Sequence, residues 1–327
     1  MKQKNMRLAG ILACLLALSC AGCGVQGGLP DGSAAGEPQQ SAGETSAAGA
    51  AQEAGKNGAV PQASNGYLVS QEMGRQVDID LDGDGTADTL QVSVRQVERG
   101  EGENTWTESV LDSIVINGKE QAATGAENPL EAYQVYLESP DRDHYFITDL
   151  DTGDKALEIA LLDYGPSDDP MTWYFQYRNG ALKLIGSLPG FPDDEGSHRD
   201  GSGNVMAVGR LSLLQTWNAT FPYTLKDGTL AEVAQSQYVP LPVPDAAVAL
   251  KQKLTIYAKP DQAADTVTVE PSEEPVTFPV TDNRHWVQMR TAEGTEGWVY
   301  LKDFSTIVSD GEELSATDVF DNLVIAD

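Results

Sequence analysis

Short runs in which apolar and polar residues alternate recur along the chain from about residue 67. The clearest examples are Thr89–Val94 and Ala132–Leu137. Because neighbouring side chains of a strand point to opposite faces, this period of two predicts β-strands with one face in a core. No stretch of helical period and useful length stands out. The predicted fold class is therefore mostly β, with helix in the minority.

Two pairs of these strands are joined by dipeptides that favour tight hairpins. Asn179-Gly180 separates residues 172–178 from 181–188, and Asp227-Gly228 separates residues 222–226 from 229–233. Both dipeptides tolerate the positive φ angles that type I′ turns require. We therefore expect antiparallel hairpins at both places.

The first residues have the pattern of an export signal. Three basic residues precede an apolar run from Leu8 to Leu18, which is too short to span a bilayer. We therefore expect residues 1–22 to be a signal peptide. All three cysteines of the chain lie in or next to this segment, at positions 14, 20 and 23, so neither a disulfide framework nor a cysteine nucleophile is expected in the folded part.

The segment Cys20-Ala21-Gly22-Cys23 resembles a bacterial lipobox. The resemblance implies that Cys23 is acylated and becomes the mature N-terminus, which would anchor the protein by lipid to the extracellular face of the cell membrane. The lipobox pattern prefers Leu where this chain has Cys20, so acylation of Cys20 stays open. An ordinary secretory signal with free cysteines is the other alternative.

Residues 23–65 are rich in Gly, Ala, Ser, Gln, Glu and Pro and contain almost no large apolar side chain. Such a segment cannot bury enough surface to offset the entropy cost of ordering. We expect a disordered tether that spaces the folded part from the membrane.

The charge of the chain narrows the range of partners. It carries 50 acidic and 21 basic residues, for a formal net charge of −29. Nucleic-acid binding needs clustered Lys and Arg, and the sequence shows no such cluster. Nucleic acid is therefore not expected as a partner, whereas cations are the natural counterpart of this chain.

The folded part divides near a proline-rich segment. Residues 66–243 carry most of the alternating runs and are expected to form a β-repeat domain. Leu241-Pro242-Val243-Pro244 is typical of an extended linker, since each proline restricts the residue before it. Four or five short strands within residues 246–305 suit a small β-barrel, and residues 306–327 are expected to be an acidic C-terminal tail.

An Asp-rich loop beginning at residue 80 has the spacing of calcium ligands. Carboxylates occupy loop positions one, three, five and nine, and glycine occupies position six, where a sharp turn is needed. Calcium prefers six to eight oxygen ligands, and a backbone carbonyl at position seven can add one. The ligands expected are Asp80, Asp82, Asp84, Thr86 and Asp88. Position twelve is Gln and a strand follows, which disfavours an EF-hand; a solvated turn without an ion is the alternative.

A degenerate second copy begins at residue 149, with one residue inserted and Lys at the glycine position. Its candidate ligands for a second metal loop are Asp149, Asp151, Asp154 and Glu158. A third echo at residues 200–204 is more typical of a plain turn. The Asp-rich loops resemble those of FG-GAP or VCBS-type β repeats, which implies an ion that joins consecutive strands. Two or three such units would form a partial propeller or a curved antiparallel sheet.

The C-terminal part resembles a bacterial SH3-like domain. The resemblance depends on Gly294–Tyr300, preceded by Trp286–Met289, whereas the start at Ile256–Pro260 departs from the usual Val-Arg pattern. The family implies a groove near Tyr257, Trp286 and Tyr300 that binds peptidoglycan peptides or a surface protein. The alternative is that the tryptophans simply fill a small core.

Two acidic runs are candidates for an enzymatic site. Asp193-Asp194-Glu195 lies near His198, and Asp168-Asp169 forms the second run. Both runs lie in segments rich in Pro, Gly and Ser, and none of the common catalytic motifs occurs. No catalysis is therefore expected.

Together these features predict a non-catalytic cell-surface lipoprotein. A calcium-stiffened β domain would present an SH3-like module to the cell wall or to a partner protein. A secreted, wall-targeted hydrolase with catalysis in residues 67–243 and a purely structural spacer are the alternatives.

Overall fold

The computed structural model describes residues 67–102, 104–123, 144–163, 169–243 and 247–326. The expected signal peptide, Cys23, the tether, the strand Ala132–Leu137 and Asp168 lie outside these ranges. Within them the chain forms 23 strands and one helix of four residues, α1 (Ala316–Val319). The prediction of a mostly β fold is confirmed.

Three antiparallel sheets are formed before residue 233. The first sheet contains, in order, β2 (Val77–Ile79), β3 (Asp88–Glu101), β4 (Asn104–Ile116) and β5 (Lys119–Glu120). The second contains β1 (Leu68–Glu72), β6 (His144–Thr148), β7 (Glu158–Asp163), β8 (Met171–Arg178) and β9 (Ala181–Pro189). The third contains β10 (His198–Arg199), β11 (Asn204–Leu213), β12 (Gln215–Lys226) and β13 (Thr229–Glu232). These strands therefore form separate sheets instead of one continuous curved sheet.

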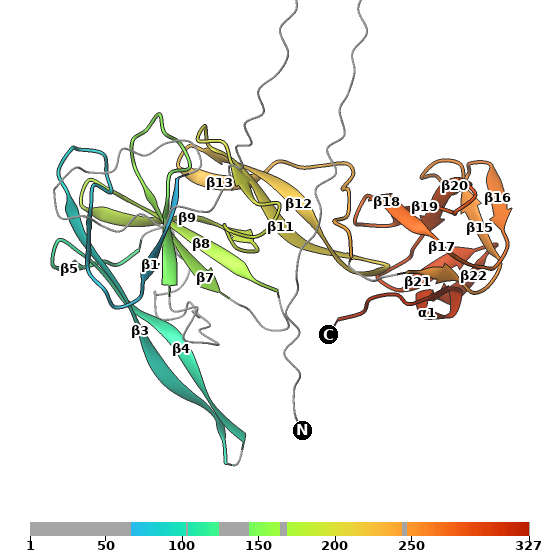
Figure 1. Cartoon of the computed structure of the whole chain (residues 1–327), viewed down its shortest axis with the longest axis horizontal. Coiled ribbons are helices and arrows are strands. Elements are labelled where there is room, and N and C mark those ends of the chain that lie inside the picture. The colour runs from blue at the N-terminus through green and yellow to red at the C-terminus, as the bar shows by residue number, and fades with distance from the viewer. Residues whose placement is uncertain (1–66, 103, 124–143, 164–168, 244–246, 327) are drawn as a thin grey trace, which may run out of the picture. The chain divides into compact units, whose positions relative to one another are not determined.

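Both hairpin predictions are confirmed. Asn179 and Gly180 connect β8 to β9 with φ angles of 52° and 75°, and Asp227 and Gly228 connect β12 to β13 with φ angles of 53° and 68°. Positive φ at both central residues is the type I′ geometry whose twist matches paired strands. The predicted strand Thr89–Val94 lies within β3, which pairs with β4 in the long hairpin that Figure 1 shows.

Each of the three sheets repeats one local pattern. An acidic turn connects β2 to β3 in the first sheet, β6 to β7 in the second and β10 to β11 in the third. The strand after each turn then pairs with the next strand along the chain. The acidic turns therefore occupy the same position in three related meanders.

The second sheet is buried on both faces. Successive side chains of β7 alternate between two apolar clusters, with Ile159 and Leu161 in one and Ala160 and Leu162 in the other. The first cluster also includes side chains of the first sheet: Ile79, Leu90, Val92, Leu111, Ile114 and Ile116. The second also includes side chains of the third sheet: Val205, Ala207 and Leu230. Burial on both faces explains why β7 is a continuous apolar run instead of an alternating one.

The C-terminal strands form three further sheets. A five-stranded sheet has the order β16 (Thr266–Val269), β15 (Leu254–Tyr257), β20 (Glu296–Tyr300), β19 (Trp286–Arg290) and β18 (Thr277–Thr281). A three-stranded sheet has the order β17 (Ser272–Pro275), β14 (Ala249–Leu250) and β23 (Phe320–Asp321). A two-stranded sheet contains β21 (Thr306–Ser309) and β22 (Glu312–Ser315).

The predicted C-terminal strands are present, but the described strands do not close into the small barrel that was expected. Register shifts between Thr277 and Val280 and between Ala249 and Leu250 interrupt the ladders. These irregularities bend the strands locally, and the described C-terminal strands are divided among three separate sheets.

The segment expected to be an acidic tail contains regular structure. Ile307, Val319 and Phe320 are buried in the C-terminal core. Further along, the carbonyl of Val324 accepts a hydrogen bond of 2.7 Å from the backbone N–H of Thr216.

No helix in the described part of the chain is long and apolar enough to cross a membrane.

Candidate metal centre

The first acidic turn, residues 80–87, connects β2 to β3. Its glycines take backbone conformations that other residues rarely adopt, with φ of 73° at Gly83 and 88° at Gly85. A Cβ on Gly83 would lie 2.5 Å from the carbonyl oxygen of Lys155, which belongs to the second acidic turn. Glycine is therefore needed at position 83 both for its conformation and for the close approach of another backbone.

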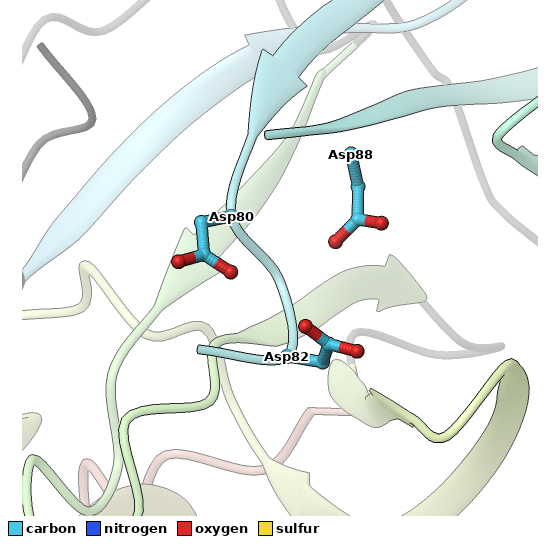
Figure 2. A group of neighbouring side chains, drawn as sticks. All are labelled: Asp80, Asp82 and Asp88. Carbon is cyan, nitrogen blue, oxygen red and sulfur yellow. The ribbon is translucent and has the colours of Figure 1, made fainter. Parts of the chain in front are cut away.

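Three carboxylates of this turn gather around one point. One oxygen from each of Asp80, Asp82 and Asp88 lies within 4.8 Å of the others. Figure 2 shows the three side chains, two from the turn and Asp88 from the start of β3, directed toward a shared space. Among the described residues this is the one group of three or more acidic, His or Cys side chains with metal-binding spacing.

Backbone donors fix the orientation of these carboxylates. Asp80 accepts hydrogen bonds from the backbone N–H groups of Gly83, Asp84 and Gly85 at 2.9, 3.2 and 2.9 Å. Asp88 is buried and accepts one at 3.0 Å from the backbone N–H of Leu81. The carboxylates are thus held in place before any ion arrives, which lowers the entropy cost of binding one.

Two of the five predicted ligands do not join the carboxylate group. The side chain of Asp84 instead accepts a hydrogen bond of 2.7 Å from the backbone N–H of Thr86. Thr86 was expected to contribute its backbone carbonyl, so its place in a coordination shell is still a prediction. Sequence reasoning missed Asn117, whose side-chain amide donates to Asp88 at 2.6 Å. Its sequence signal was the Asn117-Gly118 turn dipeptide between β4 and β5.

Electrostatics at this turn favour a bound cation. Burial raises the pKa of Asp82, and the negative charges of Asp84, Asp88 and Asp80 raise it further, although the backbone N–H of Asp84 partly offsets these effects. A divalent ion among the carboxylates would reverse the repulsion and favour their ionised forms.

The second acidic turn has matching hydrogen bonds. Glu158, at the start of β7, accepts a bond of 2.9 Å from the backbone N–H of Leu150, as Asp88 does from Leu81. Its other oxygen accepts one of 2.8 Å from the side-chain amide of Gln176, as Asp88 does from Asn117. Lys155 has a φ of 62°, which agrees with its assignment to the glycine position. The two turns are therefore structural copies.

Two carboxylates of the second turn are buried. Burial raises the pKa of Glu158 to about 8 and that of Asp149 to about 6, and neighbouring negative charges add to both effects. Asp151 and Asp154 instead accept hydrogen bonds from backbone groups of their own turn, those of Gly153 at 3.0 Å and Ala156 at 2.9 Å. The four predicted ligands therefore lie in one turn, but they do not reproduce the compact group of the first turn.

The third turn, expected to be plain, belongs to the same series. Asp200 accepts bonds from the backbone N–H groups of Ser202 and Asn204 and from the Asn204 side-chain amide. These donors, with the Asn204 amide first, lower the pKa of Asp200 well below its ordinary value. The turn thus satisfies its first carboxylate internally.

One hydrogen bond recurs between successive turns. The backbone N–H of Leu157 donates to the carbonyl of Leu81 at 2.9 Å, and that of Gly203 donates to the carbonyl of Leu150 at 2.7 Å. In each pair the donor directly precedes a strand and the acceptor follows the first Asp of its turn. The three turns are thus linked in sequence order by the backbone.

The predicted ligand-groove residues also come together. Trp286 lies 5.4 Å from Tyr257 and 5.0 Å from Tyr300, measured between ring centroids, and all three side chains are half-buried. Trp298, on the same sheet, is only 8% exposed and belongs to the core. The two tryptophans therefore have different environments, and the Tyr257, Trp286 and Tyr300 rings offer a partly exposed aromatic surface.

Two residues of the acidic runs that were candidates for catalysis, Asp194 and Asp169, make contacts within the fold. Asp194 accepts a hydrogen bond of 2.6 Å from the backbone N–H of Phe191, and burial raises its pKa. Asp169 forms an ion pair with Arg210 at 3.2 Å. His198 is exposed at the start of β10.

No protein-family model matches the chain, and no curated protein or solved structure matches it either.

Proposed function

We propose that this chain is an exported, lipid-anchored, non-catalytic protein of the cell surface whose β-repeat domain is stabilised by calcium. The observation that supports the proposal most directly is the group of Asp80, Asp82 and Asp88. Three converging carboxylates with oriented oxygens are the ligand type that a hard cation prefers. The sequence features of residues 1–23 supply the export and anchoring part of the proposal.

Calcium would act structurally. Without an ion, three like charges within one turn oppose the compact arrangement; a bound ion removes this repulsion. Because the ligands come from the turn after β2 and from the start of β3, pairing of β2 with β3 brings them together and the complete site exists in the folded state. An ion that binds the folded state alone stabilises it by about 2.7 kcal/mol when its concentration is 100 times its Kd.

Thermal unfolding of the full-length chain tests this proposal. Calcium should raise the unfolding midpoint relative to a chelator, and the double variant Asp80→Asn, Asp82→Asn should lose that increase. The matched control is Asp265→Asn with Asp321→Asn, which removes two exposed carboxylates outside the turn. Equal midpoints with calcium and with chelator in the unsubstituted protein would contradict the proposal.

The second part of the proposed function is binding to the cell wall or to a surface protein through Tyr257, Trp286 and Tyr300. Half-buried aromatic rings provide rigid contact area at small entropy cost, which is typical of binding surfaces. Retention of the full-length chain on purified peptidoglycan should fall with Trp286→Ala. Trp106→Ala serves as the matched control, because Trp106 is 54% exposed on β4. Equal retention of both variants would contradict a role for the aromatic surface.

A further inference from the structure

One carboxylate of the second acidic turn is buried without a well-formed hydrogen bond. Asp149 is 1% exposed, and both of its side-chain oxygens are enclosed and lack a partner of normal geometry; the backbone of Asp151 lowers its pKa only in part against the effect of burial. The copy of this residue in the first turn, Asp80, accepts three backbone hydrogen bonds, and Asp200 in the third turn is also satisfied. A buried carboxylate is costly unless it is paired with a cation or a donor. Asp149 in the second turn therefore lacks the cation or donor that a buried carboxylate needs.

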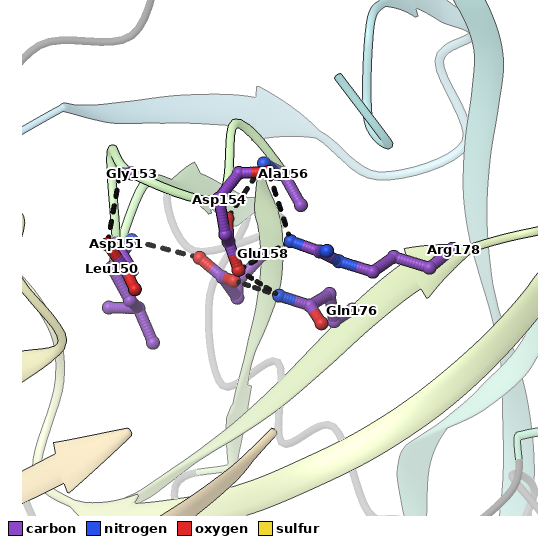
Figure 3. Close-up of polar contacts among 8 residues, drawn as sticks. All are labelled: Leu150, Asp151, Gly153, Asp154, Ala156, Glu158, Gln176 and Arg178. Carbon is purple, nitrogen blue, oxygen red and sulfur yellow. Dashed lines mark hydrogen bonds and ion pairs between the residues drawn. The ribbon is translucent and has the colours of Figure 1, made fainter. Parts of the chain in front are cut away.

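A positive group of the protein itself already reaches this turn. A guanidinium nitrogen of Arg178, at the end of β8, lies 2.5 Å from a carboxylate oxygen of Asp154 and 3.2 Å from its backbone carbonyl. Figure 3 shows Arg178 and Gln176 entering the turn from the same strand, next to Asp154 and Glu158. Asp154 is the copy of Asp84, since both accept a bond from the N–H two residues later. The guanidinium thus binds the carboxylate that corresponds to Asp84, one of the ligands predicted for the first turn.

We propose that Arg178 takes the place of a divalent cation in the second turn, so that the chain binds one divalent ion, at the first turn, and would bind a second if Arg178 were removed. Without Arg178, Asp154 would be released to join the unpartnered Asp149 around an ion. The proposal rests on the proposed calcium site only for the ion at the first turn.

The exposure of the pair is compatible with competition by an ion from solvent. The side chains of Arg178 and Asp154 are 39% and 28% exposed, so this side of the turn is accessible, whereas Asp149 and Glu158 form its buried side. A guanidinium is a fixed single charge with planar donors, whereas calcium collects six or more oxygens. The two cations therefore compete for the same carboxylate but cannot both use it fully.

Counting bound calcium tests the proposal. The full-length chain is dialysed against calcium in about 0.15 M salt, which screens weak binding to exposed carboxylates. The unsubstituted protein should bind one ion and Arg178→Met two. The matched control is Arg95→Met, which removes the partner of an exposed ion pair with Asp112 and should leave the count at one. Adding Asp149→Asn to Arg178→Met should return the count to one, which places the second ion at this turn.

The double variant Asp80→Asn, Asp82→Asn separates this proposal from the proposed function. With Arg178 present it should bind no ion, and with Arg178→Met it should bind one. If the unsubstituted protein binds none and Arg178→Met binds one, the calcium site of the first turn is wrong and the role of Arg178 stands. Two ions in the unsubstituted protein, or no gain with Arg178→Met in a variant that melts cooperatively, would overturn the role of Arg178.

Discussion

Replacement of Glu158 by Gln should change the pH dependence of folding stability. Glu158 is fully buried, and its pKa rises from 4.5 to about 8 because burial disfavours the charged form. Between these two values the folded state binds a proton that the unfolded state has lost. The contribution of Glu158 to the free energy of unfolding should therefore be highest below about pH 4.5 and fall as the pH rises to about 8.

The magnitude follows from the pKa difference. Each pKa unit corresponds to about 1.4 kcal/mol, so ionisation of Glu158 costs the folded state at most about 5 kcal/mol. The contribution of Asp149 to stability changes with pH in the same direction, since burial raises its pKa to about 6. That contribution is lost over a lower pH range. Above about pH 6.5 the remaining decrease in the free energy of unfolding should therefore come mainly from Glu158.

Glu158→Gln removes the titration and keeps the packing. The new amide oxygen can accept the hydrogen bond from the Leu150 N–H, and a flipped Gln176 amide can accept one from the new NH₂ group. The variant should be less stable than the unsubstituted protein at pH 5 or show no change there, and more stable at pH 8.5.

Urea unfolding of the full-length chain between pH 5 and 9, with chelator present, measures this difference. Glu293→Gln serves as the control, because Glu293 is exposed in the turn between β19 and β20. Parallel stability curves for the unsubstituted protein and Glu158→Gln would show that burial of Glu158 does not control its protonation.

Three further changes test other parts of the fold. Asn117→Ala removes the amide that donates to the buried Asp88, so it should lower the free energy of unfolding in urea by about 1–3 kcal/mol and weaken calcium binding. Replacement of the exposed Asn104 by Ala should have neither effect. Ile159→Ala leaves a cavity between the first and second sheets and should cost about 2–5 kcal/mol, compared with a small effect of the exposed Val267→Ala; equal effects would contradict the packing of β7. Gly83→Ala places a Cβ 2.5 Å from the Lys155 carbonyl and should destabilise more than Gly85→Ala, which has open space; the reverse order would refute the close contact between the turns.

The local chemistry of the chain determined much of the fold. Period-two patterns predicted strands, and the Asn-Gly and Asp-Gly dipeptides located two hairpins, because a strand's side-chain period and a turn's φ angles depend on neighbouring residues alone. The spacing of Asp80, Asp82 and Asp88 likewise identified three carboxylates that gather, since one short turn brings them together.

Only the tertiary structure decided how the three turns differ and which distant groups serve them. The amides of Asn117 and Gln176 and the guanidinium of Arg178 come from strands or turns 18 to 29 residues away in sequence. The tertiary structure also decided how the sheets are arranged. Both faces of β7 are buried, so its sequence shows no alternation of apolar and polar residues. Sequence spacing fixes what a single turn can hold, whereas long-range strand pairing decides whether its charge is balanced by an ion or by the chain itself.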